Sequence, residues 1–266
     1  MSLVIWILLL VSGVLYSIAF INALIPFLSK RAYEESIFYR ISFVGLTLHT
    51  LALALATYEA GSVPMSSVYE LFILIAWLVM FIALIFSRIF RLKIAMFFGA
   101  MISAILVLLP LTCPYFNINI QAQVKSPLTT SHIFFAGLSY AFMGLGLVFA
   151  IIQNLQISAL RKKKNSFFFR LLPSLTSITK YLFAVEFLAV FTMFLSIVLG
   201  VASFFVYDLN LSDLALKFAC AFAIFFMQLG FVILSNKNLL RGNLQGYYAI
   251  ILFIVSMLLL FPIDYT

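Results

Sequence analysis

The sequence predicts an all-α integral membrane protein, a polytopic bundle of about eight transmembrane helices. Three observations lead to this prediction. Of the 266 residues, 65% are apolar, 17% are aromatic and only 9% carry a charge, whereas soluble domains carry roughly 25% charged residues. The apolar residues form continuous runs of about 20, the length that spans the hydrocarbon of a bilayer. The basic residues stand between these runs, mostly in every second connection, which is typical of polytopic membrane proteins.

Eight segments are long and apolar enough to be membrane helices. Their apolar runs are continuous rather than alternating, which favours helices over the strands of a membrane barrel. Each helix can then satisfy its own backbone hydrogen bonds within the bilayer. The second and the eighth are short. The predicted spans are Val4–Leu28, Ile41–Tyr58, Val68–Ser87, Ile94–Cys113, His132–Gln153, Tyr181–Val206, Leu214–Ser235 and Gly246–Pro262.

The first run is predicted to be a membrane helix that the mature protein keeps. No charged residue occurs between Met1 and Ser29, so the segment lacks the basic region with which a signal peptide begins, and it is longer than the apolar region of one. No stretch between the runs is long enough for a soluble domain. We therefore expect residues 1–266 to form a single integral membrane domain.

The basic residues predict the orientation. The connections after the first, third, fifth and seventh predicted helices hold 14 of the 16 Lys and Arg, whereas the other connections hold at most one each. Because basic connections mark the cytoplasmic side, both termini are expected on the non-cytoplasmic side of a bacterial inner membrane. The longest basic connection, Gln156–Lys180, combines Arg161–Lys164 with Phe167–Phe169 and is expected to lie on anionic lipid.

Several function classes are not expected. In a soluble protein the net charge of +8 would suggest nucleic-acid binding, but here membrane topology accounts for the basic residues. The sequence contains no GxSxG, phosphate-binding loop or HExxH motif, so we expect a protein that is not an enzyme of the hydrolytic or phosphoryl-transfer kind. Cys113 and Cys220 form no CxxC or CxxCH motif, which argues against a thioredoxin-like, zinc-ribbon or covalent c-type haem site.

His49 is one of two histidines within the predicted helices. It lies in the middle of the second helix, where ionisable side chains are rare and often functional. A neutral imidazole there could join two helices by a hydrogen bond, or it could bind haem or a metal ion. The residue alone leaves both interpretations open.

His132 begins the fifth predicted helix, at its outer end. An interfacial histidine costs little and needs no function, but haem ligation is the alternative. The residues behind it have small side chains that allow close approach of a second helix or of a flat ligand. They are Gly137, Ala141, Gly144 and Gly146.

Depth separates the two histidines. At a rise of 1.5 Å per residue, His49 should lie roughly 10 Å or more deeper in the membrane than His132. The two axial nitrogens of one haem are only about 4 Å apart, since metal–imidazole bonds are near 2 Å. We therefore expect that one haem does not use both histidines.

Glu186 lies about one and a half turns into the sixth predicted helix. A carboxyl group at this depth is expected to be protonated or paired. A structural pair is one interpretation and a proton relay is the other. The candidate partners are Lys180, Gln153 and Asn154.

Glu70 begins the third predicted helix. Ser66 or Ser67 followed by Glu70 has the pattern of a capping box, and a glutamate at a helix amino end is also favoured by the helix dipole. This local role accounts for Glu70 without a function.

Four features occur in an order and spacing that resemble those of the cytochrome c assembly membrane proteins (CcsA type), in particular their shorter HemX- and YpjD-like branch. The first resembles the family's P-L-S-N-x-Y-E-S … W pattern, the second its external-histidine helix, and the third the linker and sixth helix of the shorter branch. The fourth is a membrane histidine that this branch often has. The resemblance covers about residues 46–200. The features are Pro64–Phe72 with Ala76-Trp77, Ser131–Ala141, Leu172–Phe183 and His49.

The resemblance implies haem handling, because CcsA-type members carry haem across the membrane and present it for attachment to apocytochrome c. It implies haem as cofactor, His49 and His132 as its ligands, and other cytochrome c assembly components as partners. The family presents haem on a tryptophan-rich external segment. Here the equivalent stretch, Tyr207–Asp213, has no tryptophan, and the seventh predicted helix has Met227 and Gln228 in place of a histidine. Haem attachment itself is therefore not expected.

Three functions remain as hypotheses. The first is a non-enzymatic protein for haem handling or for the biogenesis of a haem-dependent membrane system. The second is a small-molecule or ion transporter, for which Glu186 is the best support, although no inverted repeat and no paired Gly/Pro helix breaks of the kind found in transporters are visible. The third is a membrane regulator or scaffold of haem biosynthesis that presents Arg161–Arg170 to a cytoplasmic enzyme.

Overall fold

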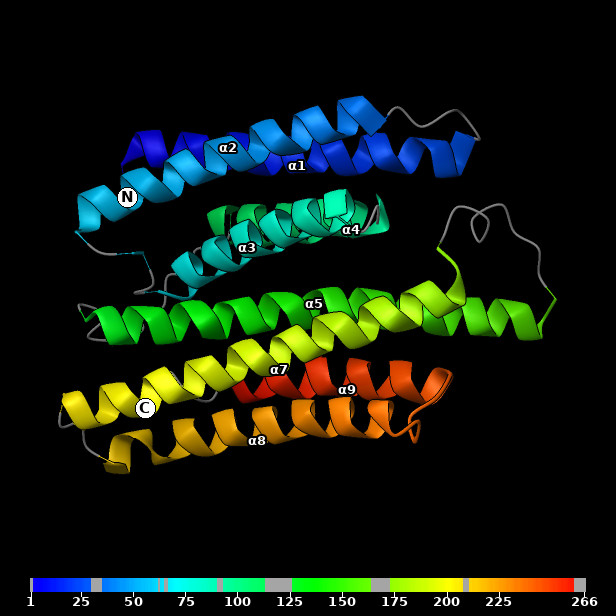
Figure 1. Cartoon of the computed structure of the whole chain (residues 1–266). Helices are drawn as coiled ribbons and strands as arrows, with labels where there is room; N and C mark the ends of the chain where they lie inside the picture. Colours follow the sequence, from blue (N-terminus) through cyan, green and yellow to red (C-terminus); the bar gives the residue numbers. More distant parts are fainter. Residues whose placement is uncertain are drawn as a thin grey trace. The chain divides into compact units, whose positions relative to one another are not determined.

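The computed structural model describes residues 2–29, 35–61, 63–64, 67–89, 93–112, 126–163, 173–207 and 211–260. Within these ranges the chain is all-helical, with eight helices and no strand, as the sequence predicts (Figure 1). The helices are α1 (Leu3–Ser29), α2 (Glu35–Ala60), α3 (Val68–Ile89), α4 (Lys93–Thr112), α5 (Pro127–Arg161), α7 (Leu175–Val206), α8 (Leu211–Asn236) and α9 (Asn243–Leu260).

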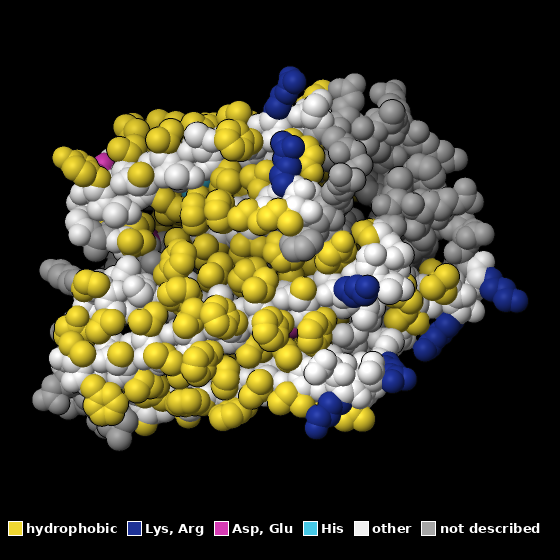
Figure 2. Space-filling view, viewed as in Figure 1, with side chains coloured by type: hydrophobic (Ala, Val, Ile, Leu, Met, Phe, Trp, Pro, Cys, Tyr) yellow, Lys and Arg dark blue, Asp and Glu magenta, His cyan; other side chains and the backbone are white. Residues whose placement is uncertain are grey.

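Seven of the described helices are long and apolar enough to cross a membrane. The eighth, α9, is apolar but has only 18 residues, in line with its short predicted span. Large apolar side chains cover the outer faces of the helices, whereas the Lys and Arg side chains lie toward helix ends (Figure 2). The chain is therefore a polytopic membrane protein whose helices contact the lipid bilayer directly.

The chain forms two compact units, Met1–Val124 and Lys125–Thr266. In unit 1, α1 packs against α2 and α4, and α3 packs against α4 and, less extensively, α2. In unit 2, α5 packs along α7 and against α9, while α8 contacts both α7 and α9. In each unit, the four described helices thus form a ring in chain order. Whether both units belong to a single membrane domain stays a prediction.

The helices α5 and α7 extend well beyond their predicted spans. Ser126 caps α5 by accepting a hydrogen bond from the backbone N–H of Thr129 at 3.1 Å, and Ser174 caps α7 in the same way. With 35 residues, α5 is about 52 Å long, more than the roughly 30 Å of hydrocarbon. Spans predicted from apolar runs stop at the first polar residues. In α5 and α7, however, the helix extends through serine, threonine and glutamine residues beyond those runs.

Basic residues mark one end of each unit. In unit 1, Arg40 lies in the second turn of α2 and Arg88 in the last turn of α3, so both lie toward the end where α1 finishes. In unit 2, six exposed basic residues lie where α5 and α8 end and where α7 and α9 begin; we call them the basic end of unit 2. They are Arg161, Lys162, Lys163, Lys180, Lys237 and Arg241.

Some predictions fall on residues outside the described ranges. These are Cys113, Ser66 of the capping box, Lys164–Arg170 of the basic and aromatic connection, and part of the Tyr207–Asp213 stretch. The other predicted cap is described: Ser67 Oγ accepts a hydrogen bond from the backbone N–H of Glu70 at 3.2 Å. Cys220 is a buried free thiol in α8.

Candidate functional site

His49 lies in the core of unit 1 and has no exposed surface. Its Nδ1 is 3.3 Å from the hydroxyl group of Tyr16 on α1, which is also fully buried. Its Nε2 has no hydrogen-bond partner among the described residues. His49 therefore joins α1 to α2, and a haem could reach Nε2 only if the surrounding helices moved. Haem ligation by His49 stays a prediction.

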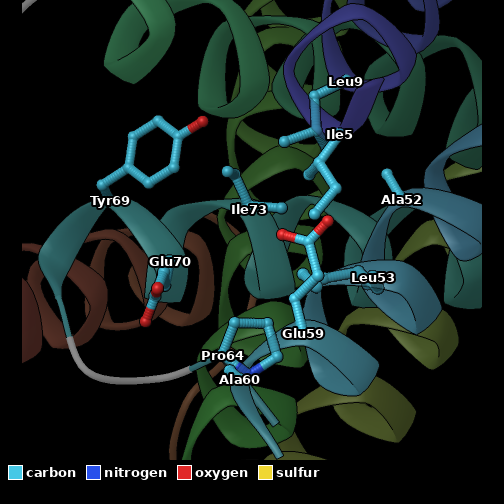
Figure 3. Close-up of a pocket in the computed structure, with 11 residues that line it drawn as sticks. Ile5, Leu9, Ala52, Leu53, Glu59, Ala60, Pro64, Tyr69, Glu70 and Ile73 are labelled. Atoms are coloured by element: carbon cyan, nitrogen blue, oxygen red, sulfur yellow. The ribbon is translucent and has the colours of Figure 1, made fainter. Parts of the chain in front are cut away.

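A pocket of about 240 Å³ opens one turn beyond His49, between the start of α1, the end of α2 and the start of α3 (Figure 3). Its walls are mainly apolar, and Glu59, Tyr69 and Glu70 supply its polar groups. In Figure 3 the Glu59 side chain extends between the aliphatic side chains, whereas Glu70 turns away from them. Small-molecule sites usually measure about 300–1,000 Å³, so this pocket is small for a haem-sized ligand.

His132 lies near the start of α5 and contacts α7. Its Nδ1 is 2.7 Å from the backbone carbonyl oxygen of Ser196 and 3.0 Å from Ser196 Oγ, which in turn donates to the His132 carbonyl at 3.0 Å. A carbonyl oxygen only accepts, so Nδ1 carries the proton and Nε2 keeps its lone pair. Histidines that bind metals usually have this arrangement.

The imidazole of His132 packs against Gly200. A Cβ atom at this glycine would stand 2.9 Å from Nδ1 of His132, so a larger residue would displace the ring. Haem ligation by His132 stays a prediction. The two histidines belong to different units, and the expectation that one haem does not use both stays a prediction.

Glu186 is 1% exposed and lies about one third of the way along α7. Neither carboxyl oxygen has a hydrogen-bond partner among the described residues, so the predicted pair with Lys180, Gln153 or Asn154 is absent. The physical reason is axial distance, because Gln153 bonds to Thr179, seven residues and about 10 Å along α7 from Glu186. The carboxyl group instead lies directly against Gly146 of α5.

Four residues of α5, spaced by seven, face α7. Together with the α7 residues that they contact, they form what we call the α5–α7 seam. Residues spaced by seven lie on one face of a helix. His132 meets Ser196, Ser139 Oγ donates to the Ala189 carbonyl at 2.9 Å, Gly146 meets Glu186, and Gln153 Nε2 donates to Thr179 Oγ1 at 3.3 Å. Polar groups thus recur along this interface, between apolar residues that both helices bury.

The seam also takes a contact from α8. Gln228 Nε2 donates to Ser139 Oγ at 3.2 Å and contacts Met143 Sδ at 2.8 Å. In the sequence, Gln228 is noted only because it occupies a helix in which the family resemblance would place a histidine. The signal for the seam was available in the sequence as the seven-residue spacing of His132, Ser139, Gly146 and Gln153.

Comparisons with known proteins find a distant sequence similarity to the HemX proteins of two bacteria. No family model matches the chain. It is 26% identical to Protein HemX of Bacillus subtilis (strain 168) over 191 residues, which cover 71% of this chain and 69% of that protein. It is also 26% identical to Protein HemX of Brevibacillus brevis over 142 residues, about half of either chain. Kinship with the larger CcsA-type proteins stays a prediction. The chain is thus a polytopic helical membrane protein distantly related to the bacterial HemX proteins.

Proposed function

We propose that the protein is a non-enzymatic membrane regulator or scaffold of haem biosynthesis. The observation that carries this proposal is the similarity to HemX over 191 residues. The arrangement of the described residues supports it, because their polar groups serve mainly to join helices and the basic end of unit 2 offers a surface outside the bilayer.

The basic end is the surface that would contact a partner. Its six Lys and Arg side chains are exposed, and no acidic side chain is described at that end of unit 2. Such a surface attracts an acidic partner over about one Debye length, roughly 8 Å at physiological salt. The partner we propose is a soluble enzyme of haem biosynthesis with an acidic face.

The orientation is part of the same proposal. Basic residues at one end of each unit, together with the positive-inside rule, support a bacterial inner-membrane protein whose basic ends face the cytoplasm. Both termini would then face away from it. A partner enzyme at the basic end of unit 2 would accordingly be cytoplasmic.

The proposal is tested by the levels of haem and haem precursors in the native host. Deletion of the protein should change these levels, and the intact protein should restore them. A variant with Lys162 and Lys163 replaced by Glu should insert normally but fail to restore them. A variant with Lys217→Glu, at the other end of unit 2, serves as the control. Unchanged precursor levels after deletion would remove the proposal.

Haem handling is the second candidate, and the geometry of His132 favours it. The Nδ1–H of His132 bonds to the Ser196 carbonyl, so Nε2 keeps the lone pair with which it would bind the iron of a haem. When bound, haem would supply redox and ligand-binding chemistry that the side chains lack. An absorption spectrum of the purified protein with added haem should show a bound-haem band that His132→Ala loses and His49→Ala keeps. An unchanged spectrum in both variants would reject this candidate.

A further inference from the structure

Glu186 lies far from both ends of α7, with its carboxyl group enclosed. It is eleven residues from Leu175 and twenty from Val206, or about 16 Å and 30 Å along the helix axis. The side chain is 1% exposed, and neither oxygen has a partner among the described residues. An ionised carboxylate without a partner is strongly disfavoured inside a membrane protein. The resting form is therefore the neutral acid.

Among the described residues of the surrounding helices, no charged group compensates Glu186. The residue of α5 that faces it is Gly146. His132 is bonded to Ser196 at the far end of the seam, and Tyr248 of α9 donates to the Met227 carbonyl at 2.9 Å. Lys180 is exposed, and so are the described basic residues of α8 and of the α8–α9 turn.

A group of buried amides lies between Glu186 and the basic end of unit 2, and its nearest member, Gln153, is about 10 Å from Glu186 along the helix axis. We call this group, formed by α5 and α9, the amide cluster. Gln153 Nε2 donates to Gln245 Oε1 at 3.2 Å and to the Gly242 carbonyl at 3.3 Å. The cluster consists of Gln153, Asn154, Gln156 and Gln245.

The amide cluster contains polar atoms that no described residue satisfies. These are Oε1 of Gln153, Oδ1 and Nδ2 of Asn154, and Oε1 of Gln156. Buried polar atoms are nearly always hydrogen-bonded, to protein or to water. Four unsatisfied atoms within one helical turn of α5 therefore favour the entry of water at this end of unit 2.

In the other half of the seam, between Glu186 and His132, the hydroxyl groups have hydrogen-bond partners. The Ser139 and Thr192 hydroxyls donate to backbone carbonyls of α7, and Ser196 Oγ donates to the His132 carbonyl at 3.0 Å. Gln228 Oε1 is the exception, since it has no partner among the described residues. Water should therefore approach Glu186 more easily from the amide cluster than from the other half of the seam.

We propose that Glu186 is a proton-binding site that exchanges its proton with the basic end of unit 2 through the amide cluster. In this exchange the O–H bond of the carboxylic acid breaks, the proton passes to water, and the carboxylate remains. The reverse step restores the acid. The site is independent of the proposed role in haem biosynthesis and would give the protein a response to protons on one side of the membrane.

Infrared spectroscopy of the full-length protein in lipid vesicles tests the site itself. On transfer from H₂O to D₂O, the carbonyl band of a protonated carboxylic acid shifts to lower frequency as COOH becomes COOD. The wild-type protein should show this shift, and Glu186→Gln should lose it. Because glutamine closely resembles the neutral acid in shape, Glu186→Gln should unfold at the wild-type temperature. The control Glu59→Gln, a carboxyl group of unit 1, should keep the shift.

The rate of the same shift tests the path. With Gln153 and Gln245 both replaced by leucine, the half-time of exchange should lengthen by about tenfold or more, a factor that corresponds to about 1.4 kcal/mol in the barrier. A matched pair in the other half of the seam, Ser139→Ala with Thr192→Val, should change the half-time by less than about twofold. Asn154→Leu alone should also slow exchange and provides a milder change if the double variant unfolds.

Three results would overturn the proposal. The first is a wild-type protein without an exchanging carboxylic-acid band, and the second is a band that Glu186→Gln leaves in place. The third is an exchange rate that the amide variants leave unchanged or that the hydroxyl variants slow instead. The first two reject the proton site, and the third rejects the path.

Discussion

Gly146 and Gly200 lie opposite the two ionisable side chains of the α5–α7 seam. A Cβ at Gly200 would press on the ring of His132, and a Cβ at Gly146 would overlap the carboxyl group of Glu186. Both contacts join α5 to α7, where small residues permit close approach. At the residue scale, the absence of a side chain at these two positions allows polar groups to be buried between the helices.

Gly146→Ala should destabilise the protein by about 1–3 kcal/mol, because the added methyl group overlaps a carboxyl group that has little room to move. Gly144→Ala is the matched control, since its Cβ would meet only the Phe253 ring at 3.9 Å. It should be neutral or stabilising by up to about 1 kcal/mol. Thermal unfolding in detergent measures both effects.

The double variant Gly146→Ala with Glu186→Ala should recover most of the stability that Gly146→Ala loses, because the second change removes the overlapping atoms. If the two losses simply add, Gly146 and Glu186 do not contact each other and the packing described for the seam is wrong.

At the scale of helices, the contact between α5 and α7 is the most extensive one in unit 2. Its polar contacts recur every seven residues along α5 and include the bond between Ser139 Oγ and the Ala189 carbonyl. Interhelical hydrogen bonds in membrane proteins contribute about 0.6 kcal/mol on average. The seam therefore aligns the two helices and fixes their register more than it stabilises them.

Ser139→Ala should lower the free energy of unfolding by about 0.6–1.7 kcal/mol, because it removes a bond to α7 and an acceptor for Gln228 on α8. Ser256→Ala is a suitable control, since Ser256 Oγ bonds only within its own helix, to the Leu252 carbonyl at 2.7 Å. Unfolding in mixed micelles with increasing SDS measures both. Equal losses would mean that Ser139 does not join the helices.

At the scale of the whole molecule, the described helices form two units of four, with basic residues at one end of each. If those ends face the cytoplasm, single cysteines in a cysteine-free background should react asymmetrically with an impermeant thiol reagent. Cysteine at Lys163 or Lys237 should react only after the membrane is opened, and cysteine at Lys217 should react in intact cells. The reverse pattern would invert the proposed topology.

The sequence predicts the number and positions of the helices because both follow from composition and length. It underestimates α5 and α7, since their ends are polar yet capped by Ser126 and Ser174. The pair expected for Glu186 is wrong because sequence distance alone does not show which residues share a level on antiparallel helices. Contacts such as Tyr16 with His49, or Gln228 with Ser139, depend on how each helix is rotated about its axis. The spacing of apolar residues does not show this rotation when all faces of a helix are apolar.

Photo-cross-linking in living cells can show whether the basic end of unit 2 binds a cytoplasmic enzyme of haem biosynthesis. A photoreactive amino acid is placed at Lys163 or, as the control, at Lys217, and the cross-linked products are identified by mass spectrometry. We expect cross-links to an enzyme of haem biosynthesis from position 163 and none from position 217. Cross-links from position 163 to lipid alone, or the same products from both positions, would contradict this expectation.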